Sequence, residues 1–118
     1  MKAKKIHGKK QKYERISLQG TALIHDDDHL FAAPLENLSR GGLFLSQLTS
    51  MKQGQVVKLV IKSEELAVPF QAEGRVVRVE SSERKGIAIE FISLKAFAVK
   101  LIENRVSEKT LESELKLL

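Results

Sequence analysis

The residues with the clearest chemical potential are Asn37 and Ser39, which are followed by two glycines, Gly41 and Gly42. Two small polar side chains two positions apart on an extended backbone project from the same face. Glycines directly after them allow the chain to turn sharply or to lie close to a ligand. The pattern therefore predicts an exposed edge that contacts a small molecule, although a plain loop between two strands uses the same residue types.

A second candidate for binding is the strongly basic N-terminus. Residues 1–15 contain seven lysines and arginines and one glutamate, so this stretch carries +6, and the other 103 residues carry −1 of the net +5. Its six lysines stand among few apolar residues, which cannot bury enough surface to offset the entropy cost of ordering. We therefore expect residues 1–14 to form a flexible basic arm that attracts an anion, with a solubilising tail as the alternative.

Catalytic and metal chemistry have little support. His25 and His29 flank three aspartates, which is more typical of a charged hairpin tip than of a metal site. Ser39 lacks a plausible base, because all three histidines lie in polar segments. We therefore expect no enzyme activity, no metal and no cofactor. The absence of cysteine excludes disulfides and thiolate metal sites.

Length and hydropathy suit a single domain. A chain of 118 residues can bury about two-thirds of the surface that its unfolded form exposes. No apolar run approaches the roughly 18 residues of a membrane helix, and the basic start lacks the apolar segment of a secretory signal. We expect a soluble, cytoplasmic protein without membrane insertion.

Alternation of apolar and polar residues predicts the elements that position these candidates. In residues 16–24 every second residue is apolar or small, which is typical of a half-buried strand. Within residues 70–80 the apolar parity switches after Gly74, which indicates a bulge. Strands spaced by roughly 8 to 12 residues without intervening helices predict a mainly β fold, an antiparallel sandwich or small barrel over residues 15–92. The expected strands cover residues 16–24, 30–35, 43–45, 55–61, 70–80 and 86–91.

A helical period then replaces the alternation in residues 93–118. Apolar residues follow one another at helical spacing, with Ser93 as the expected N-cap. This stripe should cover one end of the barrel, and it comprises Leu94, Phe97, Ala98, Leu101 and Ile102. Beyond Val106 the tail can continue the helix, fray, or pair through its leucines with a partner or a second copy, and we expect a solvated, partly ordered end.

Taken together, these features resemble the PilZ domain family, the bacterial receptors for cyclic di-GMP (c-di-GMP). The resemblance covers residues 9–107. Asn37, Ser39 and Gly42 match the family's [D/N]-x-S-x-x-G motif, and residues 86–91 are similar to its closing strand. The stretch 9–15 lies where the family has R-x-x-x-R. The resemblance implies a six-stranded barrel with a C-terminal helix and a mobile basic arm that wraps over the nucleotide.

The resemblance also implies roles for individual residues. Asn37 and Ser39 would bond a guanine edge or a phosphate, and Gly42 would give the turn its shape. Arg15 would be the main anchor, because a guanidinium bonds bidentately to phosphate or to guanine O6 and N7. Lys10 and Lys12 would support the phosphates. Arg40, within the turn, would add a further contact or remain solvated.

One position departs from the family's pattern. With the second arginine of the motif aligned on Arg15, Gln11 takes the place of the first. Gln11 has neither charge nor fork, and a lost charged hydrogen bond typically costs about 1.5 to 3 kcal/mol. Tyr13, also in this stretch, either stacks on a guanine or packs where the arm meets the barrel, and we favour packing.

Three functions remain open at this point. The first is a c-di-GMP receptor whose arm orders on the ligand and presents a new surface to a downstream protein, as in motility or biofilm regulation. The second is a protein adaptor that has lost nucleotide binding through Gln11. The third is a nucleic-acid-binding barrel, against which the six Phe and Tyr residues of the chain offer few stacking surfaces.

Overall fold

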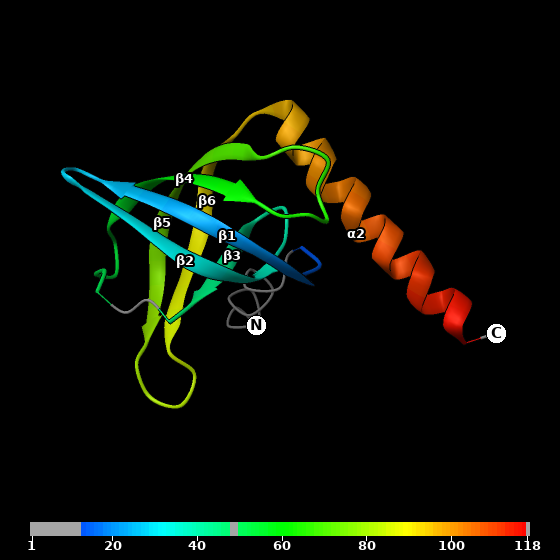
Figure 1. Cartoon of the computed structure of the whole chain (residues 1–118), viewed down its shortest axis with the longest axis horizontal. Helices are drawn as coiled ribbons and strands as arrows, with labels where there is room; N and C mark the ends of the chain where they lie inside the picture. The colour runs from blue at the N-terminus through cyan, green and yellow to red at the C-terminus, as the bar shows by residue number, and fades with distance from the viewer. Residues whose placement is uncertain (1–12, 48–49, 118) are drawn as a thin grey trace, which may run out of the picture.

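The computed structural model describes residues 13–47 and 50–117, which form six strands and one long helix. The strands close into an antiparallel barrel in the order β1-β2-β3-β6-β5-β4 (Figure 1). The mainly β barrel with a C-terminal helix is thus confirmed. The elements are β1 (Ile16–Asp26), β2 (His29–Leu38), β3 (Gly42–Ser46), β4 (Val56–Lys62), β5 (Phe70–Glu80), β6 (Gly86–Leu94) and α2 (Ala96–Lys116).

The core fills the barrel with the residues that alternate along its strands. On β1, Ile16, Leu18, Ala22 and Ile24 are buried, and most residues between them are exposed. Such alternation arises because successive side chains of a strand point to opposite faces. Closure leaves every strand paired on both sides, so the barrel has one interior and one outer surface.

Two register shifts decide which residues face outward near the ends of the strands. Between Leu35 and Asn37 the pairing of β2 with β3 shifts, so Leu38 faces the core and Asn37 lies outside it. Between Val76 and Arg78 the pairing of β5 with β6 shifts, so Arg78 is exposed. The second shift is the bulge that the change of parity predicted. An extra residue in one strand reverses the faces of those after it.

The start of α2 corrects one expectation. Ser93 is not the N-cap, because β6 continues through it and pairs Ser93 with Glu73 of β5. The helix begins at Ala96, and Lys95 precedes it without a side-chain cap. Ala98 and Ile102 join the core as predicted and Leu101 packs against it, whereas Leu94 ends the strand and Phe97 is 48% exposed.

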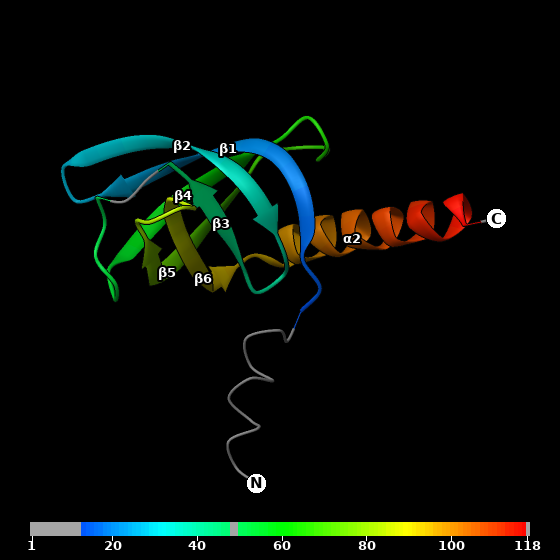
Figure 2. The ribbon, with the colours of Figure 1, turned by 90° about the horizontal axis from the view of Figure 1, so that it is seen from below.

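The end of α2 corrects a second expectation. A partly ordered tail was expected, but the helix continues to Lys116. Figures 1 and 2 both show its C-terminal part projecting beyond the barrel. Leu111 and Leu115 are exposed on this projection.

A carboxylate between two cations holds α2 to the barrel. Glu65, in the β4–β5 connection, accepts hydrogen bonds from the Gln19 N–H at 3.1 Å and from Arg105 at 3.0 Å, and Lys109 Nζ lies 3.0 Å away. Burial opposes ionisation of this carboxyl, but the Gln19, Lys109 and Arg105 contacts lower the pKa of Glu65 to about 2. We call Glu65, Arg105 and Lys109 the Glu65 clamp.

Candidate ligand-binding site

The segment that leads into β1 crosses the loop after β2. Arg15 Nη1 donates a hydrogen bond of 2.8 Å to Asn37 Oδ1. Farther out, Tyr13 lies so close to Gly41 that a Cβ on this glycine would be 2.8 Å from Tyr13 Cδ2. The structure therefore brings Arg15 and Asn37 together, and it places Tyr13 in the packing role that we favoured.

Ser39 does not have the exposed side chain that its motif suggested. The residue is only 2% exposed. The hydroxyl accepts a 3.0 Å hydrogen bond from the Gly41 N–H, and the Ser39 N–H donates to the Gly42 carbonyl at 2.8 Å. The expectation of exposure is therefore wrong. Ser39 holds the turn through backbone groups and thereby sets where the residues on either side lie.

Gly42 allows β3 to pack closely against β6, and this role is clearer than a role in the shape of the turn. It is the first residue of β3 and pairs with Glu90 of β6. A Cβ there would lie 2.1 Å from the Ile89 carbonyl oxygen, which is closer than real atoms approach. A side chain at this position would push β3 away from β6. The glycine of the motif thus fixes the barrel beside the candidate site.

Arg40 lies in the turn but already has contacts within the protein. Its Nη1 is 3.1 Å from Glu103 Oε2 of α2, and its guanidinium lies 5.2 Å from the centre of the Tyr13 ring. Both partners of this ion pair are about half exposed, so water screens the attraction. Arg40 is thus held by two partly solvated contacts, one to α2 and one to Tyr13.

Sequence reasoning missed three residues that complete the outer surface next to Asn37, namely Phe44, Arg78 and Arg84. Strand pairing sets Asn37, Phe44, Ala88 and Arg78 side by side across β2, β3, β6 and β5. Phe44 is only 1% exposed yet lies outside the core cluster. The Arg84 guanidinium covers it, 3.9 Å from the ring centre. This face thus has an apolar floor with arginines over and beside it.

Three positive charges gather around this floor. Burial and the nearby positive charges of Arg78 and Arg84 lower the pKa of Arg15. Like charges that destabilise one another in this way are relieved by a bound anion. Arg84 also pairs with Glu36, whose side chain is 44% exposed, and Arg78 with Glu80, whose side chain is 28% exposed, so both arginines already have carboxylate partners. We call Arg15, Arg78 and Arg84 the arginine cluster.

Part of this arrangement had a signal in the sequence. The unbroken apolar run at residues 43–45 means that one residue of β3 must be apolar on the outer face, and that residue is Phe44. The parity switch in β5 places Arg78 outside. For Arg84, in the β5–β6 connection, local sequence carries no such signal, because its position over Phe44 depends on how distant strands pair.

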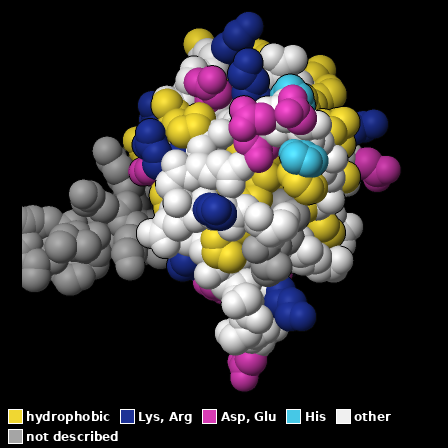
Figure 3. All heavy atoms as spheres, turned by 90° about the vertical axis from the view of Figure 1, so that its left-hand side faces the viewer, with side chains coloured by type: hydrophobic (Ala, Val, Ile, Leu, Met, Phe, Trp, Pro, Cys, Tyr) yellow, Lys and Arg dark blue, Asp and Glu magenta, His cyan; other side chains and the backbone are white. Residues whose placement is uncertain are grey.

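Other predicted features fall outside the described residues or find no support within them. Lys10, Gln11 and Lys12 are not among the residues that the structure describes. At the β1–β2 hairpin tip, histidines and acidic side chains gather on the surface (Figure 3). Across residues 13–47 and 50–117, no group of three His, Asp or Glu side chains is placed to hold a metal ion. The one helix found there is too polar to cross a membrane.

Comparison with known proteins identifies the family and the fold. The sequence matches the PilZ domain over residues 9–108. A search of curated protein sequences finds no match. Among solved structures, the inhibitor of motility MotI/DgrA of Bacillus subtilis superposes with a TM-score of 0.70 at 19% identity, covering 85% of this chain and 51% of that protein.

Two further structures are complexes. YcgR from Escherichia coli with c-di-GMP has a TM-score of 0.75 at 14% identity, with 91% of this chain and 49% of that one covered. PlzA from Borreliella burgdorferi with c-di-GMP has a TM-score of 0.59 at 17% identity, with 87% and 44% covered. The chain thus spans about half the length of these neighbours.

The six-stranded barrel with its C-terminal helix is the fold of PilZ-like structures. Because the family match covers most of the sequence, this chain belongs to the PilZ domain family. At identities below 20%, the structural neighbours show the shared fold, and the ligand of each is a property of that protein.

Proposed function

We propose that this protein is a receptor for c-di-GMP, which binds on the outer face of the barrel between Arg15 and the arginines of β5 and the β5–β6 connection. Family membership supports the proposal, as do the two neighbours solved with this nucleotide. The ligand carries two phosphates and two guanines. Guanidinium groups match both, because they bond bidentately to phosphate and to guanine O6 and N7.

The observation that carries the proposal is the placement of Arg15. Asn37 holds its guanidinium at 2.8 Å, and Arg78 and Arg84 lie close enough to lower its pKa. An arginine fixed among other arginines, on an exposed face with an aromatic floor, forms a preorganised anion site. Arg15 is accordingly the anchor, and Asn37 both orients it and offers its own amide to the nucleotide.

The remaining motif residues take supporting roles in this proposal. Ser39 acts through the turn that it holds, and Gly42 through the contact of β3 with β6. Arg40 would exchange Glu103 for a phosphate. Lys10, Gln11 and Lys12 would reach the ligand as the arm closes over it, and the ordered arm would present a surface to a partner protein. The protein acts as a receptor rather than as an enzyme.

A protein adaptor that does not bind the nucleotide is the second candidate. The observation in its favour is that the chain fills part of the face itself, because Tyr13 covers Gly41 and Arg40 contacts both Tyr13 and Glu103. A nucleotide has to displace or reuse these contacts. Gln11 further reduces the charge available to the arm.

Titration calorimetry with c-di-GMP separates the candidates. We expect saturable binding by the intact chain and a loss of about ten- to a hundredfold in Arg15→Ala, which removes a charged hydrogen-bonding contact. Arg84→Ala should weaken binding by about tenfold. Lys62→Ala, which removes an exposed cation of β4, is the matched control and should bind as the intact chain does.

The opposite results are equally informative. No heat at high micromolar c-di-GMP favours the adaptor. Equal binding by Arg15→Ala and the intact chain places the ligand elsewhere on the protein. Affinity for a polynucleotide that falls steeply with salt favours a nucleic-acid-binding barrel instead.

A further inference from the structure

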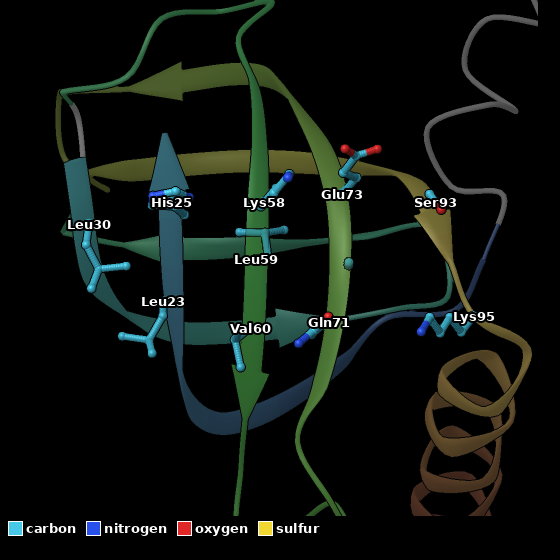
Figure 4. A pocket seen from close by; sticks show the side chains of 11 residues that line it. Leu23, His25, Leu30, Lys58, Leu59, Val60, Gln71, Glu73, Ser93 and Lys95 are labelled. Atoms are coloured by element: carbon cyan, nitrogen blue, oxygen red, sulfur yellow. The ribbon is translucent and has the colours of Figure 1, made fainter. Parts of the chain in front are cut away.

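The barrel has a shallow apolar groove on a part of its outer surface that the c-di-GMP proposal does not use. The groove has a volume of about 430 Å³ and runs across β1, β4 and β5 toward the start of α2. Figure 4 shows Leu23 on β1, Val60 on β4 and Leu30 on the neighbouring β2, with Lys58 and Lys95 among the residues around them. Leu30 is 67% exposed. Apolar side chains that gather on an exposed sheet mark a surface for a partner.

A second unpartnered apolar surface lies on the projecting end of α2. Leu111 and Leu115 are each 57% exposed and lie one turn apart. Leu111 comes nine residues after the buried Ile102, about two and a half turns, so it points away from the barrel. Glu108, Glu112 and Glu114 surround the two leucines, and all three are exposed. Glu108 and Glu112 also lie 3.0 and 3.8 Å from Arg105 Nη1.

The two surfaces carry net charges of opposite sign. The groove lining has two lysines, Lys58 and Lys95, against one acid, Glu73. The end of the helix has three glutamates against Lys116 and Lys109, and Lys109 already pairs with Glu65. An amphipathic helix laid into an apolar groove is a common mode of recognition, and charges at the rim fix its orientation.

The helix cannot reach the groove of its own barrel. The Glu65 clamp fixes α2 at Arg105 and Lys109, and Thr110 Oγ1 contacts Glu14 Oε2 at 3.1 Å. Lys95 lines the groove, and Leu111 lies sixteen residues farther along, about 24 Å in a straight helix. The occupant of the groove must therefore come from another molecule.

We propose that two copies of this protein form a symmetric dimer in which the Leu111–Leu115 face of each α2 docks into the β1–β4–β5 groove of the other. Two-fold symmetry makes the contact twice, with the α2 helices antiparallel, and closes the assembly at two copies. Doubling also raises the buried area toward the roughly 1,200–2,000 Å² of specific interfaces. The proposal does not depend on nucleotide binding.

Sedimentation velocity with charge-reversed variants of the full chain tests this pairing. The intact chain should dimerise reversibly with concentration. A groove variant, Lys58→Glu/Lys95→Glu, and a helix variant, Glu112→Lys/Glu114→Lys, should each weaken dimerisation by about tenfold or more, because like charges then meet at both contacts. Circular dichroism confirms that each variant is folded.

Mixing the two variants provides the decisive measurement. In the mixed dimer, one contact sets the introduced glutamates of the groove variant opposite the introduced lysines of the helix variant, and the other contact keeps the original charges. The mixture should therefore dimerise again. Matched controls reverse exposed charges elsewhere, namely Lys85→Glu/Lys100→Glu and Glu83→Lys/Glu90→Lys, and should dimerise as the intact chain does.

Three results would overturn the proposal. The first is an intact chain that stays monomeric at all concentrations. The second is a dimer that persists in both charge-reversed variants. The third is a mixture that remains monomeric although each variant alone has lost the dimer, because groove and helix end would then not be partners.

Discussion

The arginine cluster and the Glu65 clamp each hold a partly shielded arginine, but Arg15 of the cluster and Arg105 of the clamp are in opposite electrostatic states. In the clamp, the hydrogen bond to Glu65 raises the pKa of Arg105. In the cluster, burial and the neighbouring Arg78 and Arg84 lower the pKa of Arg15. Arg105 faces the carboxylate of Glu65. Arg15 faces the neutral amide of Asn37 and the positive charges of Arg78 and Arg84.

The difference indicates what each region contributes. A guanidinium that is matched by a carboxylate of its own chain stabilises the fold, here by fixing α2 to the barrel. A guanidinium that lies among other guanidinium groups is stabilised most when it binds an anion from outside the chain. Removing each arginine in turn should therefore affect different properties of the protein.

The largest expected effect comes from Arg105→Ala. This substitution leaves Glu65, which is only partly exposed, with one cation in place of two. Breaking such a pair from one side costs about 2–4 kcal/mol of unfolding free energy when the pair is mostly shielded from water. Arg15→Ala, at the exposed cluster, should cost less than about 1 kcal/mol. Urea unfolding followed by circular dichroism measures both, and equal losses would contradict the distinction.

The pH dependence of stability tests the clamp from the carboxylate side. The folded pKa of Glu65, about 2, lies below the ordinary value of 4.5 for a glutamate, so the clamp contributes fully above about pH 4.5 and its contribution is lost as the pH falls toward 2. The loss amounts to at most about 3 kcal/mol. Compared with the intact chain, Glu65→Gln should have a flatter stability profile in this range.

Arg15→Ala is the control for this titration. It should keep the slope of the intact chain between pH 4.5 and 2, because the partner of Arg15 is an amide that does not titrate. A flattened slope in this variant would mean that the two regions are coupled.

The contrast between the regions also explains how much the sequence predicted. Most strands are half-buried, so alternation identified most of them, and the apolar run 43–45 identified β3. Arg15 directly precedes β1 and Asn37 lies in β2, so both were placed by strands that the sequence predicted. The position of Arg84 over Phe44 depends on the pairing of β3 with β6 and on the pairing of β6 with β5. Pairings of segments far apart in sequence leave no local periodicity to detect.

The errors have a similar cause. Ser93 has the side chain of an N-cap, but strand pairing with β5 outweighs that local preference and delays the helix to Ala96. Ser39 has the side chain of an exposed ligand contact, but the turn uses its hydroxyl for the Gly41 N–H. In both cases the residue type was compatible with two roles, and tertiary contacts selected between them.

Ser39→Ala separates the two roles and should have an intermediate effect. Loss of the hydroxyl leaves the Gly41 N–H without its bond in a buried turn, which costs about 1–2 kcal/mol of stability. Asn37→Ala, whose bond to Arg15 is exposed, should cost less stability and weaken c-di-GMP binding by about tenfold. Thermal unfolding and calorimetry on the same samples measure both effects. If Asn37→Ala is the less stable variant, Asn37 belongs with the residues that hold the fold.

The smallest expected effect sharpens the comparison at the arginine cluster itself. If the cluster binds an external anion, a further guanidinium from the arm should add to it, whereas the clamp should not respond. Gln11→Arg should therefore tighten c-di-GMP binding by about tenfold without changing urea stability. Gln11→Lys supplies the charge without the planar fork and should gain less. Equal gains from both would show that charge alone matters, and no gain from either would mean that the arm meets the ligand through other residues.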